Sequence, residues 1–90
     1  MIVRLYGDFL DAVGTRDVYL WLDRPATVGD ALARLVEKHP AVGEVLYADG
    51  EIRGDVHVVH NRREVWEKHG LETAVSPEDE LALFSPVGEG

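Results

Sequence analysis

The side chains in this sequence that could bind a metal ion or act as nucleophiles are few and scattered. The chain has no cysteine, which excludes disulfides, thiolate metal sites and a cysteine nucleophile within these 90 residues. His57 and His60 are three residues apart in a predicted strand, where side chains alternate between the two faces. They therefore point to opposite faces and cannot bind one ion together, and we predict no metal site.

Two other groups of residues are candidates for catalysis, and neither forms a recognisable site. Ser76 and Ser85 have no histidine and acid in a triad-like pattern around them. The acidic run 78–80 could supply carboxylates for acid–base chemistry, but we interpret it as a solvated loop, part of which is a candidate contact for a basic partner. No cluster combines a nucleophile, a base and an orienting group, so we predict no catalytic residue and no enzymatic activity.

The C-terminal stretch is the remaining feature that could carry chemistry. Residues 81–84 alternate as a strand does, and Pro86 then ends the pattern because proline cannot donate to a sheet ladder. We predict a flexible tail at about residues 86–90, which contains two glycines, Gly88 and Gly90. Most termini are simply frayed, whereas this one continues directly from a core strand. We interpret the tail as the working part and the rest of the chain as its support.

Length and charge limit the classes of function. Ninety residues predict one domain, residues 1–90. The net charge of −8 would be repelled by phosphate backbones, so we expect no nucleic-acid partner. No stretch approaches the roughly 20 apolar residues of a membrane span, and the N-terminus lacks a signal peptide, so we expect a cytoplasmic protein that does not bind membranes. The acids are either a solubilising surface, as in salt-loving organisms, or a face that steers towards a basic partner.

One helix has clear boundaries in the sequence. Thr27 is a good N-cap residue, and Asp30 follows three positions later as in a capping box. Pro40 disfavours helical geometry at His39, so the helix is expected to end there. Its apolar residues recur at helical spacing and form one stripe: Val28, Ala31, Leu32, Leu35 and Val36.

The other elements are shorter. Strands are predicted at 2–6, 18–22, 56–60, 63–65 and 81–84, from their apolar alternation. A helical turn is predicted at 9–13 and a weaker helical piece at 41–48. Asn61-Arg62 is predicted to be a tight turn, because asparagine tolerates positive φ. Residues 70–73 are predicted to form a turn that buries Leu71.

This order of elements predicts an α+β fold, in which one main helix packs on one face of a mixed sheet. In the last strand, Leu81 and Leu83 point to one face, and Ala82 and Phe84 point to the other. Because a single main helix covers a single face, we predict that Phe84 lies on the uncovered face and meets a partner there together with Val87. Tyr6 and Val59 are expected to contribute to the same face.

Several motifs, in register along the whole chain, resemble the ubiquitin-like sulfur carriers of the MoaD and ThiS type. The resemblance rests on residues 3–7, 12–15, 27–32, 56–61 and 70–71, and above all on residues 79–87, Asp-Glu-Leu-Ala-Leu-Phe-Ser-Pro-Val. With its acidic surface, the chain is most similar to the small archaeal modifier proteins. This resemblance implies the β-grasp fold, a mixed sheet of four to five strands with one main helix on one face.

The resemblance also implies a function. In this family a partner enzyme of the ubiquitin-activating type uses ATP to adenylate the terminal carboxylate, here that of Gly90. The product becomes a thiocarboxylate that donates sulfur to molybdopterin, thiazole or tRNA, or it is conjugated to target-protein lysines. The implied partners are the adenylating enzyme and the large subunit of a molybdopterin synthase. In that complex this chain would be the small subunit. No cofactor binds the carrier. The residues expected to enter or contact the partner are Phe84, Pro86, Val87, Gly88 and Glu89.

The sequence departs from the family pattern in two places. The usual Phe-Pro-Pro is here Phe84-Ser85-Pro86, which is the milder change, and the other departure lies in the last three residues. The family ends in Gly-Gly, whereas this sequence ends Gly88-Glu89-Gly90. Glu89 adds bulk where the enzyme channel is narrow, and it adds negative charge near the phosphates of ATP. Three alternatives remain open. The partner enzyme accepts Glu89, the chain is a β-grasp binding module that is never activated, or the native tail differs from the one given.

Overall fold

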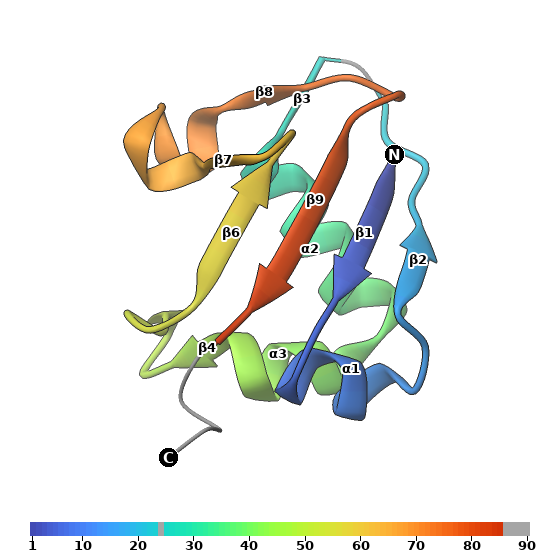
Figure 1. The fold of residues 1–90 in the computed structure, drawn as a ribbon, viewed down its shortest axis with the longest axis vertical. Coiled ribbons are helices and arrows are strands. Elements are labelled where there is room, and N and C mark those ends of the chain that lie inside the picture. Colours follow the sequence, from blue (N-terminus) through green and yellow to red (C-terminus); the bar gives the residue numbers. More distant parts are fainter. Residues whose placement is uncertain (24, 86–90) are drawn as a thin grey trace.

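A mixed five-stranded sheet forms the centre of the protein (Figure 1). The computed structural model describes residues 1–23 and 25–85. Across the sheet, the strands are β2 (Asp17–Tyr19), β1 (Ile2–Leu5), β9 (Glu80–Phe84), β6 (His57–His60) and β7 (Arg63–Glu64). β9 lies in the middle, parallel to β1 and antiparallel to β6.

The remaining elements are helices and two small strand pairs. The helices are α1 (Asp8–Val13), α2 (Val28–Lys38), α3 (Pro40–Leu46) and the 3-10 turns η1 (Val65–Glu67) and η2 (Gly70–Glu72). The pairs are β3 (Ala26–Thr27) with β8 (Ala74–Val75), and β4 (Tyr47–Ala48) with β5 (Glu51–Ile52). None of the helices in the described part of the chain is long and apolar enough to cross a membrane.

The predicted capping box of α2 is present. The Asp30 N–H donates to Thr27 Oγ1 at 3.2 Å, and the Thr27 N–H donates to Asp30 Oδ2 at 2.9 Å. These two bonds satisfy backbone donors that the first turn of a helix leaves without partners. Four residues of the apolar stripe of α2 are buried in the core, as their spacing predicts, and the fifth, Val36, is half-buried.

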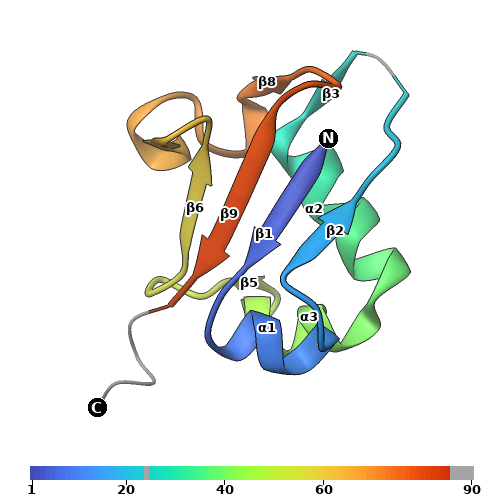
Figure 2. The ribbon, with the colours of Figure 1, turned by 45° about the vertical axis from the view of Figure 1, so that its right-hand side comes forward.

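One face of the sheet is covered and the other is open. α2 and the two shorter helices lie on the same side of the sheet, which Figure 2 shows from an oblique angle. The covered face supplies fully buried side chains from three strands, namely Val3, Leu5, Val58, Leu81 and Leu83. The predicted α+β fold, with its main helix on one face of a mixed sheet, is confirmed.

Some boundaries differ from the prediction. The strand predicted at 18–22 is observed at Asp17–Tyr19, and one further bond, from the Leu20 N–H to the Met1 oxygen, follows its end. The sheet register pairs neither residue 21 nor residue 22 with a described strand. Trp21 is 80% exposed. The strand predicted at 63–65 ends at Glu64, and Val65 begins η1.

The prediction that Leu71 is buried is wrong. Leu71 is 38% exposed, whereas Thr73, two residues later, is 5% exposed. The turn lies close to α2 at Gly29, where an added Cβ would be 3.3 Å from the Leu71 oxygen and 3.4 Å from the Leu71 Cβ. Thr73 is buried because its Oγ1 accepts from the His69 N–H and its carbonyl accepts from the Val28 N–H.

Candidate functional site: the open sheet face and the root of the tail

β9 carries the tail out of the centre of the sheet. Its residues pair with both neighbouring strands, so its position is fixed on two sides. Ala82 of β9 lies opposite Arg4 of β1, and Phe84 of β9 lies opposite His57 of β6. The Tyr6 N–H donates to the Leu83 oxygen at 3.1 Å and extends the parallel pairing past the end of β1. The tail therefore begins at a rigid point of the fold.

The uncovered face of the sheet presents the residues that the strand parity predicts. Phe84 and Ala82 from β9 and Val59 from β6 are half-buried, while the residues between them are buried on the helix side. Tyr6 is 36% exposed. The prediction that Phe84 points away from the core is therefore confirmed, but Phe84 is half-buried rather than fully exposed because a neighbour covers it.

That neighbour is His57. Its ring stacks on the Phe84 ring, with centroids 4.8 Å apart and an interplanar angle of 11°. His57 Nδ1 also contacts the Glu64 carboxylate on the edge strand β7. The stack holds Phe84 flat at the end of β9, beside the point where the tail begins. His60 lies on the other face, as predicted from its spacing to His57, and is 6% exposed.

A second group of contacts holds the residue before Pro86. Ser85 Oγ donates to Asp55 Oδ2 at 3.2 Å. Arg53 donates to both oxygens of Asp55, at 3.1 and 2.7 Å, and to the Val45 carbonyl at 2.9 Å. Hydrogen bonds from Arg53 lower the pKa of Asp55, although partial burial opposes this shift. The root of the tail is thus connected to the segment that follows α3.

The open face is polar at its margin. Arg4 forms ion pairs with Asp17 at 3.9 Å and with Glu80 at 3.2 Å. The Arg16 guanidinium lies over the Tyr6 ring, 5.0 Å from its centroid. A shallow cavity of about 130 Å³ lies among these residues, and its lining includes Arg4, Tyr6, Val59, Arg62 and Ala82. An apolar centre with a charged rim is typical of a protein-binding surface.

The remaining predicted site residues lie outside the described residues. They are Pro86, Val87, Gly88, Glu89 and Gly90. Their roles, and the predicted flexibility of 86–90, therefore stay predictions. Within residues 1–23 and 25–85, there is also no group of three or more metal-ligating side chains placed to share one ion.

The interpretation of 78–80 as a solvated loop is correct for Glu78 alone. Asp79 Oδ2 contacts His60 Nε2 at 2.8 Å and accepts from the Ser76 N–H at 2.8 Å. Lys68 Nζ lies 2.8 Å from His60 Nδ1. Glu80 pairs with Arg4. The inward parity of His60 in its strand was the one signal in the sequence for this network, because a buried imidazole needs polar partners.

This network is expected to make the stability depend on pH. Burial alone would raise the pKa of Asp79, but hydrogen bonds from His60, Asn61 and the Ser76 N–H outweigh it and hold the pKa below 3.8. A carboxyl with a depressed pKa stabilises the fold above its ordinary pKa and loses this effect as pH falls through the depressed value. We expect Asp79→Ala to cost about 2 kcal/mol at pH 7 and less at pH 3. Chemical denaturation at both pH values measures the difference.

The matched control for this experiment is Glu78→Ala, one residue away and exposed. It is expected to change the free energy of unfolding by less than about 0.5 kcal/mol at either pH. An equal effect of the two variants, or an effect of Asp79→Ala that does not shrink in acid, would contradict the role given to the network.

Comparisons with known proteins agree with this architecture along nearly the whole chain. The sequence model of the ThiS family matches residues 3–90. Small archaeal modifier protein 1 of Haloferax volcanii is 40% identical over 88 residues, which cover 97% of each chain. Small archaeal modifier protein 3 of the same organism is 35% identical over 88 residues, which cover 98% of this chain and 96% of the relative.

The solved structures give the same result. The crystal structure of small archaeal modifier protein 1 from Haloferax volcanii superposes with a TM-score of 0.90 at 38% identity, and it covers 100% of this chain and 98% of the other. The predicted β-grasp fold is thereby confirmed. The match also spans the last strand, from which the tail begins.

Proposed function

This chain belongs to the ThiS family, and from this premise we propose that it is a small modifier or sulfur carrier whose reacting group is the carboxylate of Gly90. An ATP-dependent adenylating enzyme activates the carboxylate, and the carrier then supplies sulfur or becomes joined to a lysine. The observation that carries the proposal is the arrangement around β9. A strand fixed on both sides leads directly to the glycine-containing tail, beside a sheet face that no described helix covers.

The chemistry needs nothing from the carrier except its end group. A carboxylate oxygen attacks the α-phosphate of ATP, pyrophosphate leaves, and the acyl-adenylate has AMP as a good leaving group. A sulfur nucleophile then displaces AMP and leaves a thiocarboxylate, whereas a lysine amine leaves an isopeptide bond. Glycine suits a narrow channel to the nucleotide because it has no Cβ. The open face supplies the binding energy that holds the tail in that channel, since Phe84, Val59 and Tyr6 offer apolar area there.

Intact mass spectrometry tests this proposal. The protein is incubated with the adenylating enzyme of the source organism, ATP and sulfide. We expect a mass increase that corresponds to the exchange of one oxygen for one sulfur, and no increase when ATP is omitted. An unchanged mass under conditions in which the enzyme activates another carrier would count against activation of this chain.

A second candidate function is a binding module that keeps the fold but is never activated. Glu89 favours it, because a carboxylate one residue before the reacting group adds bulk and negative charge near the triphosphate. The variant Glu89→Gly separates the two functions. If both chains gain sulfur, the carrier function holds for the natural tail. If only the variant gains sulfur, the natural chain acts as a binding module under those conditions.

A further inference from the structure

Two hairpins in this protein have positive φ at both turn residues, but only one of them has glycine at the second position. The β4–β5 hairpin turns through Asp49 and Gly50, with φ of 55° and 82°. The β6–β7 hairpin turns through Asn61 and Arg62, with φ of 49° and 74°. Two-residue loops with positive φ at both positions are type I′ turns, for which the second residue is usually glycine. The first hairpin follows this rule, and the second has an arginine in its place.

The turn with Arg62 is less stable than the same turn would be with glycine at position 62. Asparagine tolerates the left-handed region, and Asn61 is also held there because its Oδ1 accepts from the Glu80 N–H at 3.0 Å. Arg62 has a Cβ that opposes the same conformation, at a cost that glycine would avoid. A residue kept in an unfavourable conformation when a better one exists suggests that its side chain has a use.

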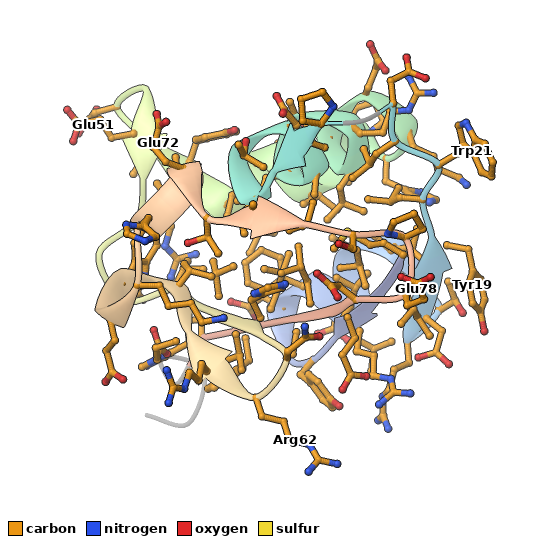
Figure 3. All side chains as sticks on the ribbon, turned by 90° about the horizontal axis from the view of Figure 1, so that it is seen from above. Tyr19, Trp21, Glu51, Arg62, Glu72 and Glu78 are labelled. Carbon is orange, nitrogen blue, oxygen red and sulfur yellow. The ribbon has the colours of Figure 1, made fainter. Side chains whose placement is uncertain are left out.

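The side chain of Arg62 is placed for contact with another molecule. Figure 3 shows Arg62 extending outward from the side of the sheet opposite α2. It is exposed and lines the shallow cavity on the open face together with Arg4 and Tyr6. Arg4 is neutralised by Asp17 and Glu80, whereas Arg62 forms no ion pair with any residue in 1–23 or 25–85. A guanidinium in this position is a ready donor for a carboxylate.

We propose that Arg62 binds a carboxylate side chain of the activating enzyme and fixes the register in which the open face docks. This inference rests on the proposed function, since it names a contact of that same complex. Arg62 follows the end of β6 that lies beside Glu80, so about four residues of strand, or roughly 13 Å, separate it from Phe84 at the root of the tail. A standard interface of roughly 800 Å² per partner is wide enough to include both.

The proposed contact has the opposite sign to the overall charge of this chain. The net charge of −8 attracts a basic partner surface in general. An arginine on the docking face needs a negatively charged group opposite it. A partner surface that is basic overall meets this need only if it carries an acidic side chain at that point. Paired charges of this kind suppress wrong partners and set orientation more than they add affinity.

The variant Arg62→Gly tests the proposal because it has opposite effects on stability and binding. Relief of the turn strain is expected to raise the melting temperature by about 2–5 °C. Loss of the guanidinium is expected to raise the KM of the adenylating enzyme for the carrier about fivefold or more, with kcat unchanged and with a weaker dependence of KM on salt. Arg62→Lys keeps the charge and is expected to keep most of the affinity.

The matched control is Gly50→Arg. It places an arginine in the same turn position of the β4–β5 hairpin, whose second strand begins at Glu51. Figure 3 shows Glu51 on the opposite side of the molecule from Arg62. This variant is expected to lower the melting temperature and to leave KM unchanged. If the wild-type chain is activated and Arg62→Gly has the same KM, the role of Arg62 is overturned and the carrier function stands. If the wild-type chain itself is not activated, both proposals fail.

Discussion

A chain with one alanine added after Gly90 is expected to be adenylated at least about 100-fold more slowly than the natural chain. One added residue lengthens the chain by at most about 3.5 Å, so the carboxylate no longer occupies the position in the enzyme channel that the carboxylate of Gly90 would take. A displacement of about 1 Å from the productive position can already cost roughly 100-fold, because the reacting atoms lose their alignment. Pyrophosphate release in the presence of the adenylating enzyme measures the rate.

The fold provides the control for this experiment. The added residue lies beyond the strand that the sheet holds, so the melting temperature is expected to change by less than about 1 °C. A variant that is activated at the natural rate would show that the position of the carboxylate does not matter, which contradicts a reaction at Gly90. A variant that melts much earlier would show that the tail contributes to the core.

Two neighbouring substitutions in β9 are expected to separate folding from docking. Leu83 points into the core and is fully buried, whereas Phe84 points to the open face. Leu83→Ala is expected to cost about 3 kcal/mol of unfolding free energy, which lowers the melting temperature by about 15 °C in a domain of this size. Phe84→Ala is expected to cost about 1 kcal/mol, mainly through the lost stack on His57.

The effects on activation are expected to be reversed. At a temperature where both variants are folded, Phe84→Ala should raise the KM of the adenylating enzyme for the carrier about tenfold, since a few aromatic anchors contribute most of the binding energy of such interfaces. Leu83→Ala should leave KM within about twofold of the natural chain, because Leu83 makes no contact that a partner could reach. Circular dichroism melts and steady-state kinetics measure the two properties, and parallel changes in both variants would contradict the separation of faces.

Elements whose determinants lie within a few residues of one another could be predicted from local sequence patterns. The capping box and the apolar stripe of α2 follow from spacings of three and four residues, so the helix could be predicted with its N-cap. The alternation in β9 predicted that Leu83 faces inward and Phe84 faces outward. The family was recognisable for the same reason, because its motifs are short and lie in register along the chain.

Contacts between residues that are distant in sequence could be identified only in the folded protein. The network of His60 with Asp79 joins positions 19 residues apart, and the contact of Ser85 with Asp55 joins positions 30 apart. Thr73, which is buried while Leu71 is exposed, accepts at its carbonyl oxygen from the Val28 N–H on a distant segment of the chain. No local sequence pattern predicts these contacts, because they form when separate elements pack together.

Arg62 combines both kinds of information. The sequence predicted a tight turn at Asn61-Arg62, since asparagine accepts positive φ. The positive φ of Arg62 and its position beside the open face could be seen only in the folded structure. The sequence around a turn does not show which surface the turn lies beside. Local chemistry thus determined which elements form and which group could react. The packing of those elements determined which face remains open to a partner, because the helices can cover only one side of the sheet.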